Sequence, residues 1–158
     1  MEKFSVLMSV YFKEDPNYFK SSLESILINQ TLRPTELVLI CDGDLTPGLE
    51  VVIDDFKRLF PDILRVYRKE NGGLGRALDF GLSKCSNDIV ARMDTDDVAK
   101  SNRFEKQIQV FKVHPEYDVV AAYQDRRSEG KVLSFFKKSF YATINKLSKV
   151  TLQPDASD

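Results

Sequence analysis

Residues 90–97 read VARMDTDD, a short apolar run that ends in three carboxylates, Asp94, Asp96 and Asp97. The run has the composition of a buried β-strand, and the acids follow it directly. Like charges this close together repel one another unless a cation lies among them, and hard divalent ions prefer oxygen ligands. The stretch therefore predicts a buried strand that carries a metal-assisted nucleotide site, although a solvated loop or a helix cap is the simpler alternative.

The chain around this stretch alternates apolar runs with helical patterns. Strands are predicted at residues 4–10, 37–41, 63–67, 89–93 and 118–122. Asp15 and Pro16 are typical of a helix start, and Pro61 ends a second helical pattern. Five strands that alternate with helices over short connections favour an α/β fold with one open, twisted and mainly parallel sheet flanked by helices.

Polar residues stand where three of these strands end. Ser9 and Tyr11 lie at the end of the first strand, Asp42 follows the second, and the acidic stretch follows the fourth. Ligands of open α/β sheets bind beyond the carboxyl ends of the strands. We therefore expect these residues to meet at one edge, although Asp42 is also compatible with an ordinary Asp-Gly turn.

Residues 71–76 read NGGLGR and form a glycine-rich loop before a helical pattern. The loop lacks the lysine of a P-loop and the spacing of a dinucleotide fingerprint. It would allow a ligand to approach the backbone closely near Asn71, with Arg76 facing a phosphate. An ordinary turn with a surface arginine is the alternative.

The composition bounds the class of protein. The 158 residues are 42% hydrophobic and 30% charged with a net charge of −1, which argues against nucleic-acid binding by bulk charge. Cys41 and Cys85 show no metal-ligand spacing, and there is neither a leader-like start nor an apolar run of about 18 residues. We expect a soluble, cytoplasmic protein with no nucleic-acid partner.

The pattern changes after residue 122, so we divide the chain into a domain at 1–122 and a tail at 123–158. The tail has seven Lys or Arg against four Asp or Glu, and its Phe140, Ile144 and Leu147 have helical spacing. This predicts a basic amphipathic helix that packs on the sheet. Association with the inner face of the membrane or with a partner chain is the alternative use of such a helix.

Taken in order, these segments resemble the nucleotide-sugar-binding half of glycosyltransferase family 2, which has the GT-A fold. The resemblance covers about residues 4–122. It rests on SVLMSVY at 5–11, ELVLICDG at 36–43, NGGLGRAL at 71–78, ARMDTDD at 91–97 and RFEKQ at 103–107.

The resemblance implies a glycosyltransferase that uses a nucleoside-diphosphate sugar, above all a UDP-sugar, with Mg²⁺ or Mn²⁺ on the pyrophosphate. It also implies a glycan or lipid-linked acceptor and a role in polysaccharide biosynthesis. The residues it assigns to the nucleotide sugar are Ser9, Tyr11, Asp42, Asn71, Arg76 and Asp94, of which Tyr11 would contact the nucleoside, Asp42 the base and Asp94 the ribose or sugar. It assigns the metal to Asp96, with Asp94 and Asp97 beside it.

The resemblance does not identify the base that activates the acceptor. Relatives invert the anomeric centre with a carboxylate base supplied by later sequence, and here only Asp125 and Glu129 are near. We therefore expect a catalytic half that is truncated or replaced. The alternatives are a donor-half fragment that binds nucleotide sugar or a partner without transfer, and a nucleotidyltransferase-like enzyme.

Overall fold

The computed structural model of the chain describes residues 3–123 and 156–157. The chain divides into two compact units, Met1–Gln109 and Val110–Asp158, which are described separately. The border between them falls inside the helix α4 (Arg103–Val113). The elements of the first unit before α4 are β1 (Ser5–Val10), α1 (Pro16–Leu27), β2 (Glu36–Asp42), α2 (Pro47–Leu59), β3 (Leu64–Lys69), α3 (Leu74–Leu82) and β4 (Val90–Arg92).

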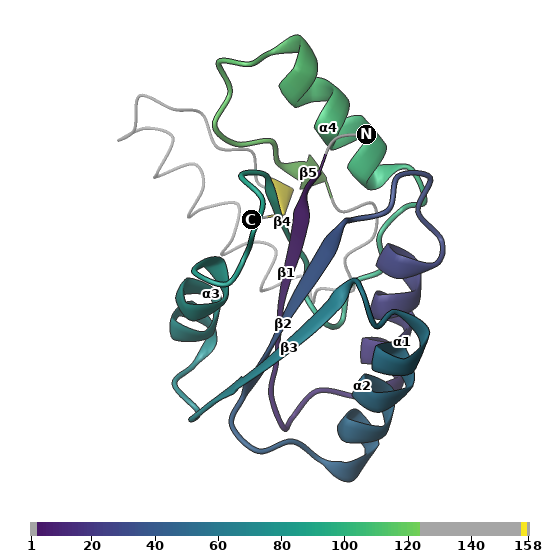
Figure 1. Cartoon of the computed structure of the whole chain (residues 1–158), viewed down its shortest axis with the longest axis vertical. Coiled ribbons are helices and arrows are strands. Elements are labelled where there is room, and N and C mark those ends of the chain that lie inside the picture. Colours follow the sequence, from purple (N-terminus) through teal and green to yellow (C-terminus); the bar gives the residue numbers. More distant parts are fainter. Residues whose placement is uncertain (1–2, 124–155, 158) are drawn as a thin grey trace, which may run out of the picture. The chain divides into compact units, whose positions relative to one another are not determined.

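The sheet of the first unit has the strand order β3-β2-β1-β4, and every pair in it is parallel (Figure 1). Val10 pairs with Cys41 at the end of β1, and Leu7 pairs with Arg92 at the end of β4. The predicted α/β fold with a parallel sheet flanked by helices is confirmed. Because the strands are parallel, their carboxyl ends meet at the same edge, where the acidic stretch begins.

Helices cover both faces of this sheet. Alternate strand residues such as Leu39 and Cys41 pack with α1 and α2, and Val38 and Ile40 pack with Ala77 of α3. Figure 1 shows α1 and α2 on one side of the strands and α3 on the other. Burial on both faces explains why β2 reads as a continuous apolar run.

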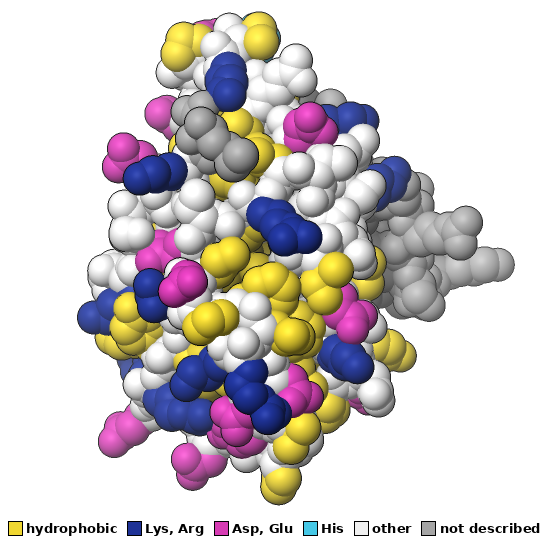
Figure 2. Space-filling view, turned by 45° about the vertical axis from the view of Figure 1, so that its right-hand side comes forward, with side chains coloured by type: hydrophobic (Ala, Val, Ile, Leu, Met, Phe, Trp, Pro, Cys, Tyr) yellow, Lys and Arg dark blue, Asp and Glu magenta, His cyan; other side chains and the backbone are white. Residues whose placement is uncertain are grey.

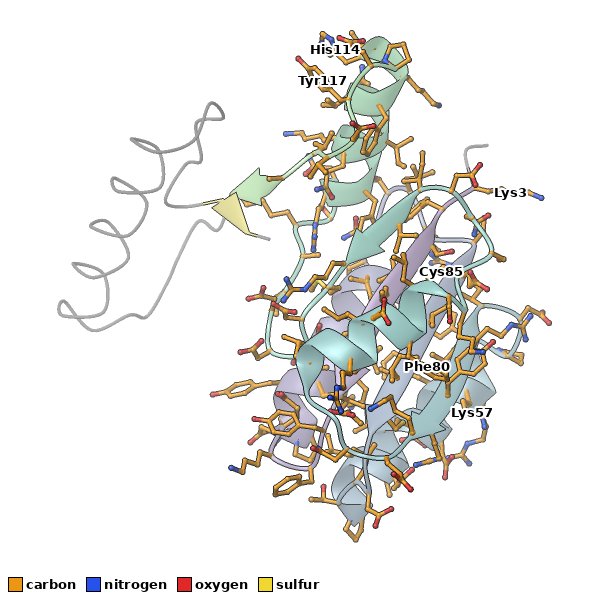
Figure 3. All side chains as sticks on the ribbon, turned by 90° about the vertical axis from the view of Figure 1, so that its left-hand side faces the viewer. Lys3, Lys57, Phe80, Cys85, His114 and Tyr117 are labelled. Atoms are coloured by element: carbon orange, nitrogen blue, oxygen red, sulfur yellow. The ribbon has the colours of Figure 1, made fainter. Side chains whose placement is uncertain are left out.

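The face under α3 has the smaller core. Phe80 of α3 meets Tyr67 of β3 edge to face, with ring centroids 6.5 Å apart, and Cys85 is partly buried in the same cluster. Figure 3 looks onto this side and labels Phe80 and Cys85. Helix α3 ends at Leu82, and Cys85 lies in the following turn, where its Sγ donates to the carbonyl of Gly81.

Two predicted strands need correction. The strand at 89–93 is a half-buried strand of three residues at the edge of the described sheet, because β4 pairs only with β1 there. The strand at 118–122 does not join this sheet: β5 (Ala122–Tyr123) pairs antiparallel with β6 (Ala156–Ser157) in a separate sheet. Val119 is β-branched, which favours a strand, but it is 79% exposed and lies outside the strands of the described residues.

The predicted amphipathic helix of the tail lies outside the described residues. Within 3–123 and 156–157, no helix combines the length and apolar character needed to cross a membrane. On the face shown in Figure 2, Lys and Arg side chains are interspersed with Asp, Glu and hydrophobic ones. Neither sign of charge dominates that face among the residues described.

Gly81 tests how closely α3 packs on the sheet. A Cβ at this position would meet Cδ1 of Leu7 and would lie 2.8 Å from Cγ1 of Ile40. We expect Gly81→Ala to lower the free energy of unfolding by about 1–3 kcal/mol, as overpacked cores do. Gly75→Ala in the same helix is the matched control, because a Cβ there meets nothing within 4 Å. Urea denaturation measures both variants, and equal stabilities would contradict the close approach.

Candidate functional site

A pocket of about 510 Å³ lies at the carboxyl edge of the sheet. Four segments contribute to it: the end of β1 with the loop that follows, the end of β2, the loop before α3, and the acidic loop after β4. The lining residues are Ser9, Tyr11, Phe12, Lys13, Glu14, Asp42, Asn71, Gly73, Leu74, Asp94, Thr95 and Asp96. The edge predicted from the sequence is therefore hollowed in the structure.

Two arginines lie beside the acids of the loop after β4. Nη2 of Arg92 lies 3.1 Å from Oδ1 of Asp94. Burial lowers the pKa of Arg103, and the neighbouring Asp97 and Asp94 counteract this effect. These two guanidinium groups relieve part of the repulsion among the three carboxylates, and the bound cation expected there stays a prediction.

Helix α1 and the segment that follows it hold the acidic loop through buried polar side chains. The Ser22 hydroxyl donates to the carbonyl of Asp94 at 2.9 Å, and Oγ of Ser25 accepts from the N–H of Ala99 at 3.0 Å. Nε2 of Gln30 donates to the carbonyls of Ser25 and Lys100, and its Oε1 accepts from the N–H of Phe104. These serines and Gln30 are buried and hydrogen-bonded, so the loop is fixed from one side over its length.

Asp42 is the last residue of β2 and is almost fully buried, with 3% of its surface exposed. One carboxylate oxygen accepts from Nζ of Lys69 at 2.7 Å and from the N–H of Gly72 at 2.9 Å, and the other accepts from the N–H of Gly73 at 2.8 Å. Burial opposes ionisation of this carboxyl, but the three hydrogen bonds outweigh it and lower its pKa. Asp42 is therefore ionised and already bonded to the loop before α3.

Glu14 faces the acidic loop from the segment between β1 and α1. Burial raises the pKa of Glu14, a hydrogen bond with Thr95 lowers it, and the charges of Asp96 and Asp94 raise it further. The raised pKa indicates that three carboxyl groups share this part of the pocket. Asp15, which follows, caps α1 by accepting from the N–H of Asn17 at 2.7 Å and so fixes the end of the segment.

The structure brings together six of the residues proposed from the sequence and leaves two apart. Those that line the pocket are Ser9, Tyr11, Asp42, Asn71, Asp94 and Asp96. Arg76 is exposed on α3 and does not line it, and Asp97 also does not line it but lies close enough to Arg103 to act on its charge. Within the described chain, no group of three or more His, Cys, Asp or Glu side chains is arranged to hold a metal ion by itself.

Sequence reasoning missed Phe12, Lys13 and Glu14, which line the pocket between β1 and α1. A signal was present, because every residue between a strand end and the next helix cap lies at the carboxyl edge. Leu74 is an apolar residue with 51% of its surface exposed. Leu74 is the first residue of α3, and its side chain contributes to the pocket instead of the core.

The donor set fits one kind of metal site. Asp94, Asp96 and Glu14 offer hard oxygen ligands, which Mg²⁺ and Mn²⁺ prefer. Mg²⁺ is usually bound by one or two carboxylates together with the phosphates of a substrate, not by a cage of protein ligands alone. The residues therefore fit a cation that binds jointly with a diphosphate.

Solved structures with a similar fold are glycosyltransferases of the GT-A type. S. aureus TarS is 20% identical, with a TM-score of 0.61 over 82% of this chain and 23% of that chain. The mannosyltransferase PcManGT from Pyrobaculum calidifontis, in complex with GDP-Man and Mn²⁺, is 18% identical, with a TM-score of 0.62 over 90% of this chain and 38% of that chain. These likenesses define the fold as GT-A.

Sequence comparison gives the family. The family described as Glycosyl transferase family 2 matches residues 5–155, and the chain belongs to it. An uncharacterized glycosyltransferase of Haemophilus influenzae is 47% identical over 114 residues, which are 72% of this chain and 42% of the relative. An Escherichia coli relative named UDP-Gal:alpha-D-GlcNAc-diphosphoundecaprenol beta-1,3-galactosyltransferase is 45% identical over 103 residues, 65% of this chain and 37% of the relative. The chain thus spans less than half the length of these relatives.

Gln30 tests whether the segment after α1 holds the acidic loop. Gln30→Met keeps the approximate volume of the side chain but removes hydrogen bonds to Ser25, Lys100 and Phe104. We expect a loss of at least about 2 kcal/mol in the free energy of unfolding, because each buried group that loses its partner costs about 1–3 kcal/mol. Ser21→Ala removes an exposed hydrogen bond of the preceding helix α1 and should change stability by less than about 0.5 kcal/mol. Similar effects of the two substitutions on the free energy of unfolding would contradict the anchoring of the loop by Gln30.

The lowered pKa of Asp42 predicts a pH dependence of stability. Its ionised form stabilises the folded chain, so the contribution is complete above the ordinary carboxyl pKa of 3.8 and is lost as the pH falls through the lower folded value. We expect Asp42→Asn to be less stable than the parent at pH 7 and this difference to shrink below about pH 4. Denaturation across this pH range measures it. A difference that does not change with pH would contradict the stabilisation by the ionised carboxylate of Asp42.

Proposed function

We propose that this chain binds a nucleoside-diphosphate sugar in the pocket at the carboxyl edge and serves a glycosyltransferase that passes the sugar to a glycan or lipid-linked acceptor. The observation that supports this most is the pocket itself, where an aromatic side chain, an amide and carboxylates from separate loops converge. Aromatic and polar groups suit a nucleoside, and exposed carboxylates suit a cation with a diphosphate.

The residues divide by the part of the donor that each would bind. Tyr11, with 38% of its surface exposed, offers a ring on which a base can stack, and Asn71 also lines the pocket. Asp94 would accept hydrogen bonds from ribose or sugar hydroxyls, and Arg92 keeps that carboxylate in place. Asp96 is exposed and would hold Mg²⁺ or Mn²⁺, which would stabilise the charge of the diphosphate.

Transfer breaks the bond between the anomeric carbon and the diphosphate oxygen, and the acceptor oxygen forms the new bond while its proton passes to a base. A divalent cation, when bound, stabilises the negative charge of the diphosphate leaving group. The acids Asp94 and Asp96 would serve the donor side of this reaction. Asp125 and Glu129, the nearest later acids, lie outside the described residues, and we assign no base.

The names of relatives guide the choice of donor. The E. coli relative is named for UDP-Gal and a diphosphoundecaprenol acceptor, and the Pyrobaculum neighbour holds GDP-Man and Mn²⁺. We propose a UDP-sugar as donor and a lipid-linked or polysaccharide acceptor. We also propose that the protein acts at the inner face of the membrane. Binding of nucleotide sugar without transfer is the second candidate, since every group assigned here belongs to the donor side.

Asp96→Asn tests the donor site. Because the amide carries no charge and is a weaker ligand, we expect UDP and UDP-sugars to lose about tenfold or more in affinity with Mn²⁺ present, which is ~1.4 kcal/mol, and to change little without it. Calorimetric titration with UDP-, GDP- and dTDP-sugars, with and without Mn²⁺, measures this. Product detection with candidate acceptors then separates transfer from binding alone.

Asp62→Asn is the matched control, because Asp62 is exposed and lies just before β3, at the opposite edge of the sheet. It should bind as the parent does. Absence of metal-dependent nucleotide binding in the parent would contradict the proposed function. Equal affinity of Asp96→Asn and the parent would show that Asp96 does not hold the metal.

A further inference from the structure

The wall of the pocket before α3 is tied to the end of β2 by two sets of contacts. Besides the carboxylate of Asp42, the carbonyl of that residue accepts from Nδ2 of Asn71 at 3.0 Å. The N–H of Gly43 donates to the carbonyl of Lys69 at 2.9 Å. The two chain segments therefore exchange side-chain and backbone hydrogen bonds over only a few residues.

Within the described residues, Lys69 is the basic side chain that forms an ion pair with Asp42. Its side chain is 19% exposed and that of Asp42 is 4% exposed, so the pair is largely shielded from water. An ion pair shielded in this way keeps more of its attraction than a pair on the surface, and loss of one partner leaves the other charge uncompensated.

We call these contacts between the end of β2 and residues 69–73 the clasp. The backbone conformations of two glycines allow it to form. Gly73 has φ +86° and Gly43 has φ +90°. A Cβ added at Gly43 would also be crowded, because it would lie 3.0 Å from Cβ of Asn71. Residues with a side chain rarely adopt such angles. The loop therefore turns back so that the N–H groups of Gly72 and Gly73 reach the same carboxylate.

We propose that Lys69 is a positioning residue for nucleotide binding: its ion pair with Asp42 fixes residues 71–73 as the wall that meets the nucleoside. The inference rests on the proposed function, because it assumes that the pocket takes a nucleotide. It assigns to Asp42 a role beyond a contact with the base. Both oxygens of that carboxylate are engaged by the protein, so the nucleoside meets the wall that Asp42 and Lys69 hold, with Asn71 at its surface.

The position of the clasp separates two parts of the ligand. Asn71 and Gly73 line the pocket at the loop before α3, whereas Asp94 and Asp96 line it at the acidic loop. Loss of the Lys69 charge therefore weakens the binding of the nucleoside part and leaves the binding of the diphosphate and metal largely intact. A residue needed only for overall stability would not distinguish the two.

The experiment compares Lys69→Met with the parent in affinity for UDP and for inorganic pyrophosphate, both with Mn²⁺, by calorimetry. We expect about tenfold weaker binding of UDP, a change of ~1.4 kcal/mol, and less than about twofold change for pyrophosphate. Lys69→Arg keeps the charge and should restore most of the UDP affinity. Lys57→Met is the control, because Lys57, labelled in Figure 3, is an exposed lysine of α2 that does not line the pocket.

Amide resonances give a readout that does not depend on a ligand. In ¹H–¹⁵N spectra, Lys69→Met should shift the Gly72 and Gly73 signals, and Lys57→Met should not. If Lys69→Met does not fold, Lys69→Gln, which keeps a donor without the charge, replaces it in the same comparison. A parent that binds UDP and a folded Lys69 variant that binds it equally well would overturn the inference alone. A parent that binds no nucleotide would overturn the proposed function and the inference with it.

Discussion

The position of the acidic loop depends on hydrogen bonds from α1 and the segment after it, because the strand that precedes the loop is too short to fix it. β4 has three residues and pairs with β1 alone in the described sheet. The loop is held instead by hydrogen bonds to its backbone over residues 94–104, which come from Ser22, Ser25 and Gln30. Buried polar groups of this kind stabilise one arrangement, because any other leaves them without partners.

Charge in the pocket follows the same logic of compensation. Asp42 is held by Lys69 and two N–H groups, and Asp94 is held by Arg92. Asp96, by contrast, is exposed at the pocket. Both carboxylate oxygens of the buried Asp42 are engaged by the protein, so Asp42 anchors a loop. Asp94, whose side chain is 43% exposed, and the exposed Asp96 are accessible to a ligand. This difference in exposure separates the structural role of Asp42 from the binding roles proposed for Asp94 and Asp96.

The sequence predicted much of this architecture because its signals are local. Apolar runs at β1 and β2 and the start of α1 at Asp15 and Pro16 lie where their patterns placed them. The predicted strand at 118–122 was wrong because strand formation needs a neighbour, which propensity does not reveal. The acidic stretch was located correctly, but its strand is a half-buried edge, not a buried one.

The partners of the charged residues could not be predicted from sequence. Arg92 and Lys69 are 2 and 27 residues from the carboxylates that they pair with, and only the register of the strands brings Lys69 beside Asp42. Likewise, Glu14 enters the pocket because the segment after β1 lies against the loop after β4. Sequence shows which residues reach the carboxyl edge, but not which of them the fold has already satisfied.

The central claim is that this edge binds a cation together with the diphosphate of a nucleotide sugar. Crystals grown with UDP and Mn²⁺, measured at the manganese absorption edge, test it most directly. The account predicts one anomalous peak between the carboxylate of Asp96 and the diphosphate oxygens, with the uracil ring beside Tyr11. Manganese bound away from Asp96, or UDP bound outside this pocket, would contradict it.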